Sequence, residues 1–373
     1  MKNKIAYIAG AAILLIFAAL VLRSPSSESR YLRAAQAGGD YLVNNMYDDG
    51  SFVYEYDPVT DEVSDGYNIL RHAGTTYSLL ELYEATSDRQ YLASGEEGIA
   101  YLINQVMPCP TVPAAACVVE DAEVKLGGNG LAILALAKHA EVTGAKDHLE
   151  LTERLAAFIA GVQSPSGEFA VHKITNGVVD DFKSEYYPGE AMFGLAKLSQ
   201  LSGDRRWLDA AHNGARWIIT VRDAGVPTDE LPHDHWFLYA LNELAKDKQD
   251  PLYVDHAKKL TEAIAAAQHV GLTGEKKDWN GGYYDPPRST PTATRNEGLG
   301  AAYELFSRAG ETAHANVAKD TMERGIEFTL RTQHPDGGFH ESLDEYAVRI
   351  DYVQHNISAL LAFDRILKRK VET

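Results

Sequence analysis

The chain has 373 residues, of which 45% are hydrophobic and 24% are charged, a composition typical of one large or two small globular domains. Its formal net charge is −18, and no basic stripe interrupts this acidity. Nucleic acid is therefore excluded as an expected partner. A net charge of this size concerns solubility rather than fold.

The first segment in chain order is an apolar run from residue 5 to residue 22, with Lys2 and Lys4 before it. It is just long enough to span a bilayer, and the lysines favour a cytoplasmic N-terminus. A cleaved signal peptide is the alternative, but it would have a shorter apolar core and a small-residue cleavage site. We expect the following organisation: residues 1–23 as a single-pass inner-membrane anchor, 24–30 as a polar linker, 31–369 as a domain in the periplasm or outside the cell, and 370–373 as a tail.

A glycine-marked turn recurs along the rest of the chain. Its copies are marked by Gly50, Gly167, Gly282 and Gly337, with separations of 167−50 = 117, 282−167 = 115 and 337−282 = 55. These separations correspond to two, two and one units of about 57 residues, a length typical of supersecondary repeats that bury their apolar faces against neighbours. Two further turns are expected near residues 108 and 225, where helix-breaking prolines and a glycine lie.

Each unit contains two helical stretches with apolar residues at three- and four-residue spacing. The more charged stretches, expected outside, are about 31–46, 88–106, 146–163, 204–222, 251–269 and 311–333. The more apolar stretches, expected inside, are about 66–86, 128–143, 186–202, 234–247, 295–309 and 350–369. Gly144, Gly203 and Gly310 mark helix ends. No stretch alternates convincingly as a strand, although short strands are expected near 52–56 and 168–173.

Two cysteines, Cys109 and Cys117, flank a proline-rich loop. In an exported chain this arrangement predicts a disulfide, with two free thiols as the alternative. The spacing matches no zinc pattern, and we expect neither a metal nor another cofactor.

Six pairs of outer and inner helices that follow one another in the same sense around an axis close into a double-walled ring. The stretch from Glu185 to Leu198, followed by residues 202–208, resembles the repeat of six-hairpin glycosidases and related sugar epimerases. The resemblance covers roughly residues 31–369 and is one of repeat pattern. It implies an all-α (α/α)6 toroid with a central cavity. The Gln-x-x-Asp-Gly-x-Phe turn also resembles the turns of terpene cyclases and prenyltransferases.

Polar residues open the otherwise apolar inner helices, which is costly unless they have partners or line a pocket. A polar pocket at the inner-helix N-termini is one interpretation, and helix capping with buried ion pairs is the other. The expected catalytic residues are Tyr187, Glu190, Asp234, Glu297, Asp351 and His355. The expected substrate-binding residues are Arg71, His72, Tyr186, His233, His235, Trp236, Arg295 and Arg349.

Several of these residues have an alternative structural role. Glu190 can act as a general acid or base with a pKa raised by burial, or can pair with an arginine. Asp234 can simply cap its helix, and Asp351 with His355 can form either an acid–base couple or a buried hydrogen bond. His233 and His235 alone are weak indications of a metal site.

The function expected from these features is that of a membrane-anchored carbohydrate-active enzyme outside the cytoplasm, which hydrolyses, eliminates or epimerises an acidic glycan. Hydrolysis requires two opposed carboxylates. Elimination or epimerisation at a uronic acid requires a base, an acid and a cation, for which Tyr187, His72, His355 and Arg349 are candidates. The alternative is a non-catalytic glycan-binding or assembly subunit of envelope polysaccharide machinery. An isoprenoid-handling toroid is a weaker alternative, since it would need an apolar cavity.

Overall fold

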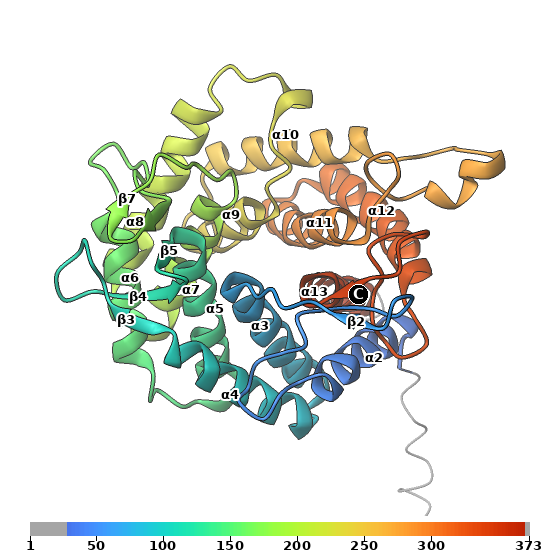
Figure 1. The fold of residues 1–373 in the computed structure, drawn as a ribbon. Helices are drawn as coiled ribbons and strands as arrows, with labels where there is room; N and C mark the ends of the chain where they lie inside the picture. Colours follow the sequence, from blue (N-terminus) through green and yellow to red (C-terminus); the bar gives the residue numbers. More distant parts are fainter. Residues whose placement is uncertain (1–27, 370–373) are drawn as a thin grey trace, which may run out of the picture.

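The computed structural model describes residues 28–369, and these form a ring of twelve α-helices in two concentric layers (Figure 1). The inner layer consists of α3 (Ile69–Thr86), α5 (Leu126–Thr143), α7 (Tyr187–Ser202), α9 (His235–Asp247), α11 (Ser289–Ala309) and α13 (Ile350–Arg369). The outer layer consists of α2 (Arg30–Asn44), α4 (Arg89–Asn104), α6 (Leu149–Gly161), α8 (Arg205–Trp217), α10 (Pro251–Ala267) and α12 (Thr312–Thr329). Each inner helix packs on the next, and α13 packs on both α3 and α2, which closes the ring.

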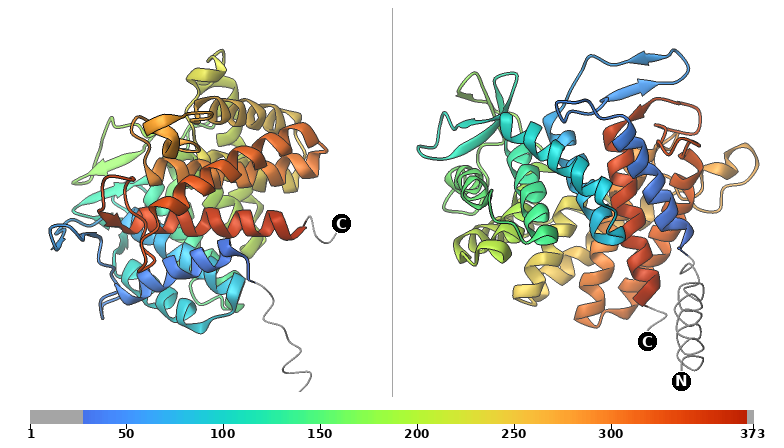
Figure 2. Two further views of the ribbon diagram at one scale, coloured as in Figure 1. Left: turned by 90° about the vertical axis from the view of Figure 1, so that its right-hand side faces the viewer. Right: turned by 90° about the horizontal axis from the view of Figure 1, so that it is seen from below.

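The predicted double-walled toroid is therefore confirmed, with the more apolar helix of each pair inside. Most helices begin and end within a few residues of the predicted positions, and Gly144, Gly203 and Gly310 are the C-caps of their helices. The exception is α11, which begins at Ser289 rather than near residue 295. The two side views show the layers along their length (Figure 2).

The predicted membrane anchor, residues 1–23, lies outside the described residues. Within residues 28–369, no helix is both long and apolar enough to cross a membrane.

The glycine-marked turns have a physical reason that the structure makes explicit. Gly50, Gly167 and Gly337 have φ of 86°, 98° and 101°, and a Cβ at any of them would overlap a backbone carbonyl of the next outer helix. In the fourth copy the residue in this position is Gly281, with φ of 94°, rather than Gly282 as the sequence pattern predicted. Each turn is thus the point where one outer helix ends against the next.

A glutamine side chain supports three of these turns. Gln163 donates to carbonyls of Gly167 and of α8, and Gln333 donates to carbonyls of Gly337 and of α2. Gln268 does the same with Gly281 and α12, although an inserted loop separates it from its glycine. The last of these contacts, between Gln333 and α2, joins the sixth unit to the first.

Two small antiparallel sheets lie in the loops that precede the inner helices. The first has the order β2-β1-β8, and the second has the order β3-β4-β5-β6-β7. Their strands are β1 (Glu55–Asp57), β2 (Glu62–Val63), β3 (Val106–Pro108), β4 (Ala116–Glu120), β5 (Glu123–Lys125), β6 (Lys173–Thr175), β7 (Val178–Val179) and β8 (Val348–Arg349). The fold is therefore mostly rather than purely helical. Strands of two to five residues are too short for alternation to show in the sequence, and their pairing between distant loops could not be read from it.

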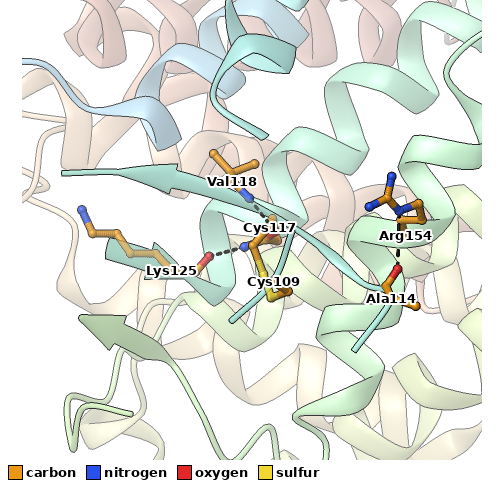
Figure 3. The surroundings of a disulfide bond; sticks show 7 residues. Cys109, Ala114, Cys117, Val118, Lys125 and Arg154 are labelled. Atoms are coloured by element: carbon orange, nitrogen blue, oxygen red, sulfur yellow. Dashed lines mark hydrogen bonds between the residues drawn. A yellow bond between two sulfur atoms is a disulfide. The ribbon is translucent and has the colours of Figure 1, made fainter. Parts of the chain in front are cut away.

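The predicted disulfide between Cys109 and Cys117 is present and links the residue that follows β3 to β4 (Figure 3). Around it, Asn129 at the start of α5 accepts a hydrogen bond from the Val118 amide and donates one to the Lys125 carbonyl. The hairpin is thereby fixed to the N-terminal end of an inner helix.

Replacing both cysteines with serine is expected to lower the free energy of unfolding by about 2–3 kcal/mol, the loop-closure value for a link of this length. Urea unfolding of the oxidised wild type and of the double variant measures the difference. Thiol titration of the unfolded, unreduced wild type should find no free thiol, and two reactive thiols would contradict the assignment.

Candidate active site

A cavity of about 370 Å³ opens at the end of the ring where the inner helices begin. The predicted site residues that line it are Arg71, Tyr186, Tyr187, Glu190, His235, Trp236, Arg295, Asp351 and His355. They come from α3, α7, α9, α11 and α13 or the residues just before these helices. Helix N-termini carry unpaired N–H groups and a partial positive charge, so this end of the ring favours anionic or hydroxyl-rich ligands.

An aromatic layer lies below the cavity. Trp236 lines its wall, and one turn deeper Phe193 and Tyr239 stack with ring centroids 5.0 Å apart. Phe193 and Tyr239 also line a separate, smaller pocket toward the other end of the ring. The upper cavity is thus a blind pocket, and a ligand enters and leaves it by the same mouth.

Other predicted site residues do not line the cavity. His72 is fully buried between the Tyr67 hydroxyl and the Gly98 carbonyl, and burial lowers its pKa to about 4. Asp234 is the N-cap of α9 and accepts from the Phe237 amide. The contacts of His72 are structural, and the contact of Asp234 matches the helix cap that the sequence leaves open as its alternative role.

Arg349 does not line the cavity, and its charge is already paired. Its guanidinium donates to Asp351 at 2.6 Å and lies 3.3 Å from Glu55. Asp351 also pairs with Arg71 at 3.3 Å. The arginine that the sequence favoured for binding a substrate carboxylate is thus occupied, and Asp351 is neutralised from two sides.

Glu190 lies one turn into α7 with only 6% of its surface exposed. Its Oε2 has no hydrogen-bond partner within residues 28–369. Burial, and then the nearby charge of Asp234, raise the pKa of Glu190 to about 8. At neutral pH this side chain is therefore a protonated carboxylic acid facing the cavity, the state required of a general acid.

Gly127 provides the room for the Glu190 carboxyl group. A Cβ at Gly127 would overlap Glu190 Oε2 and would come within 2.6 Å of the Tyr187 ring. At the neighbouring Gly128, the nearest atom to such a Cβ is the flexible end of Leu70 at 3.1 Å.

Gly127→Ala is accordingly expected to be less stable than Gly128→Ala by about 1–3 kcal/mol, the usual cost of overpacking. Both variants add one methyl group to the same turn of α5, so the difference reports the contacts of the added methyl group with Glu190 and Tyr187. Thermal and urea unfolding of the pair measures it. Equal stabilities would show that Glu190 is not held against Gly127.

His355, Glu297 and His235 form a second cluster, on α13, α11 and α9. His355 Nδ1 lies 2.7 Å from Glu297 Oε2, and His235 Nε2 lies 3.9 Å from the same oxygen. Burial raises the pKa of Glu297 to about 7. Burial opposes protonation of His355 as well, but Glu297 outweighs it and the pKa of His355 lies above its ordinary value. The two groups therefore share a proton in the neutral range, as a carboxylate–imidazole couple does.

His235 is the unusual member of this cluster. Neither ring nitrogen has a hydrogen-bond partner within residues 28–369, and burial holds its pKa well below the ordinary value. It is a neutral imidazole beside the cavity. The ligand atoms of His235, Glu297 and His355 lie within 4.8 Å of one another, so these are the described residues that can hold a divalent cation.

Glu190 faces the cluster of His355, Glu297 and His235 across the ring. In the order α3, α5, α7, α9, α11, α13, helix α7 lies opposite α13. Glu190 and His355 are thus on opposing walls of one cavity, which places an acid on one side of a bound ligand and a carboxylate-supported imidazole on the other.

The expected site residues did not include those that the loop before α11 and the first two turns of α11 contribute to the cavity. The structure places Tyr284, Arg288 and Thr294 on the wall, together with Asn68 and Gln354. Because α11 was predicted to begin near residue 295, the residues before that position were not among the expected inner-helix N-termini. The signal available was the aromatic pair at residues 283–284 followed by an arginine.

The fold is that of the six-hairpin glycosidase-like toroids. A D-mannose isomerase superposes with a TM-score of 0.70 at 16% identity, over 92% of this chain and 100% of its own. The cellobiose 2-epimerase of Bacillus thermoamylovorans B4167 superposes with a TM-score of 0.69 at 10% identity, over 90% of this chain and 99% of its own. An inactive variant of the α-1,6-mannanase GH76A of Salegentibacter sp. HEL1_6 superposes with a TM-score of 0.64 at 13% identity, over 91% of this chain and 100% of its own. Identities this low establish the fold alone, which carbohydrate-active hydrolases, isomerases and epimerases share.

No protein-family model matches the chain, and no curated protein matches its sequence.

Proposed function

We propose that this protein is a carbohydrate-active enzyme that performs acid–base chemistry on an acidic glycan in the blind cavity. The observation that carries the proposal is the opposition of Glu190, a neutral acid, and the His355–Glu297 couple across one pocket. Fold alone does not determine function, so the proposal rests on these side chains.

The side chains favour proton transfer at a sugar carbon over hydrolysis. Hydrolysis needs two carboxyl groups that both face the substrate. Asp234 caps a helix, Glu297 lies behind His355, and Asp351 is held by two arginines. The group left to act opposite Glu190 is an imidazole.

The proposed step begins when His355 takes the proton from a carbon next to a carbonyl or carboxyl group, and the electron pair moves onto that group. In epimerisation a proton returns to the same carbon from the opposite face, and in elimination Glu190 protonates the departing oxygen as the C–O bond breaks and a C=C bond forms. Glycoside hydrolysis, with Glu190 as the acid and water as the nucleophile, is the second candidate. A blind pocket of this size favours action at the end of a glycan chain.

The test is incubation of wild type and Glu190→Gln with a panel of acidic and neutral oligosaccharides in D₂O. Proton NMR reports exchange at carbon, and mass spectrometry reports new chain lengths and unsaturated products. Turnover by wild type and its loss in Glu190→Gln would support an enzyme. Deuterium bound to carbon in the product would indicate epimerisation, an unsaturated product would indicate elimination, and a shorter saturated product without deuterium at carbon would indicate hydrolysis. Glycan binding without turnover under any condition would favour a binding module, and equal turnover by both proteins would remove Glu190 from the mechanism.

We further propose that the domain works outside the cytoplasm, tethered by residues 1–23. The apolar run at residues 5–22 and the Cys109–Cys117 disulfide support this location. Fractionation of the full chain, with protease treatment of intact and opened cells, tests it. Domain cleavage only after the cytoplasmic membrane itself is broken, and not after any outer envelope has been opened, would place the domain in the cytoplasm.

A further inference from the structure

Arg295 is a buried guanidinium with no carboxylate beside it. Only 7% of its surface is exposed, and it lines the cavity from α11. Among residues 28–369, no carboxylate oxygen lies within 4.0 Å of its nitrogens. Burying a charge without a counter-ion costs free energy, so a buried guanidinium needs either a bound anion or a set of neutral hydrogen-bond acceptors.

The neighbours of Arg295 are neutral acceptors. Nε donates to His233 Nδ1 at 2.8 Å, Nη1 to the Pro291 carbonyl at 2.7 Å, and Nη2 to the Tyr284 hydroxyl at 3.3 Å. Burial, followed by the charge of Arg295, lowers the pKa of His233 to about 4, which keeps this imidazole an uncharged acceptor. A guanidinium has five N–H donors, so two remain without a partner in the described part of the chain.

The other arginines of this region differ in this respect. Arg71 and Arg349 share Asp351, and Arg349 also lies 3.3 Å from Glu55, so two carboxylates compensate these two charges before any ligand arrives. Glu190 is uncharged at neutral pH because its pKa is about 8. The cavity therefore carries excess positive charge in a protein whose formal net charge is −18.

A second arginine and a tyrosine complete this part of the wall. Arg288 is half-exposed at the mouth, and the nearest carboxylate oxygen, on Glu341, is 3.8 Å away. The Tyr284 ring lies 5.3 Å from the Arg288 guanidinium and 5.1 Å from that of Arg295. Tyr284 has φ of 75°, an uncommon backbone conformation for a residue with a side chain. This conformation brings the ring close to both cations, and its exposed part can pack on a sugar face.

We propose that Arg295 and Arg288 form the subsite that binds the carboxylate of a uronic acid unit, with Tyr284 as the wall against which the sugar ring lies. This inference rests on the proposed function in taking the ligand to be a glycan. A guanidinium fork matches a carboxylate in geometry as well as charge. The two guanidinium groups then stabilise the negative charge that develops on the carboxylate when the proton of the neighbouring C–H group is removed.

The test is equilibrium binding of galacturonate and glucuronate di- and trisaccharides, their methyl esters and the matching neutral sugars. Methyl esters keep the shape and remove the charge. Wild type is expected to bind the acids about 10–100-fold more tightly than the esters, the range of a charge-assisted hydrogen bond. Arg295→Gln should bind acid and ester alike, Arg295→Lys should recover part of the preference, and Arg288→Gln should lose a smaller part of it. Arg205→Gln, on the outer surface at a salt bridge to Asp247, is the control and should equal wild type.

Equal affinity of wild type for acids and esters, an unchanged preference in Arg295→Gln, or binding of neutral sugars but of no uronate would each overturn the inference. Sulfated oligosaccharides form a separate arm, and a preference for them over uronates would replace the carboxylate with a sulfate ester. Because the readout is binding, failure of catalysis leaves this result intact. Turnover of neutral sugars that does not depend on these arginines would instead support the proposed enzyme and contradict the proposed carboxylate subsite.

Discussion

Replacing Glu190 with glutamine is expected to lower kcat by about 10²–10⁴-fold, the usual contribution of a general acid. Glutamine has nearly the same shape as glutamic acid but cannot give up a proton to a departing or developing oxyanion. For the wild type, activity should fall as pH rises through about 8, where Glu190 loses its proton. The variant should lose this alkaline limb along with most of its rate.

The same substitution is expected to change how stability depends on pH. The pKa of Glu190 is about 8 in the folded protein against an ordinary 4.5, so the folded state binds this proton more tightly than the unfolded state does. Its contribution to stability is therefore fully present below pH 4.5 and is lost as pH rises through 8. A shift of this size corresponds to a few kcal/mol, and Glu190→Gln should remove that loss.

Urea unfolding between pH 5 and about pH 9 measures the effect for wild type, Glu190→Gln and the control Glu185→Gln. Glu185 is exposed and lies five residues earlier. Parallel pH–stability curves for wild type and Glu190→Gln would show that Glu190 is ionised in the folded protein, and its proposed role as an acid would then be wrong.

Replacing Glu297 with glutamine is expected to lower kcat by about 10²–10⁴-fold as well, because the carboxylate orients and charges the imidazole. Glu297 is also the reason that the pKa of His355 exceeds its ordinary value. Without it, burial dominates and lowers the pKa of His355, so the acid limb of the pH–rate profile should move to lower pH. The profile of kcat/KM for the variant, with Glu304→Gln on the same helix as control, measures both effects.

The same residues can also hold a cation, and chelation distinguishes the two roles. If His235, Glu297 and His355 act through proton transfer alone, EDTA treatment should leave activity and melting temperature unchanged. Loss of activity that a single added divalent metal restores would assign the cluster to metal binding, and the acid limb would then belong to a bound water.

The ring could be predicted because its signals are local and repeated. Apolar spacing located the twelve helices, and the turn glycines at Gly50, Gly167 and Gly337 fixed the repeat because only glycine fits against the carbonyl of the next outer helix. The sequence pattern pointed to Gly282 instead of Gly281 because an insertion separates Gln268 from its turn. The glutamine that defines the motif therefore does not stand next to the glycine in the sequence.

The site was harder to predict because it depends on partners far apart in sequence. The sequence shows that Arg349 and Arg295 each stand two residues before a carboxylate, but not that Arg349 pairs with its neighbour while Arg295 turns to His233. It likewise gives no sign that His355 meets Glu297 rather than Asp351. Such choices are made by packing between helices, which a single sequence does not record.

The most direct test of the cavity as an acid–base glycan site is a crystal structure of Glu190→Gln soaked with the oligosaccharide that binds it most tightly. The account predicts a terminal sugar ring in the blind cavity, with one face toward residue 190, the other toward His355, and a carboxylate on Arg295. A sugar bound instead in the separate pocket beside Phe169 and Trp217, with the blind cavity unoccupied, would contradict it.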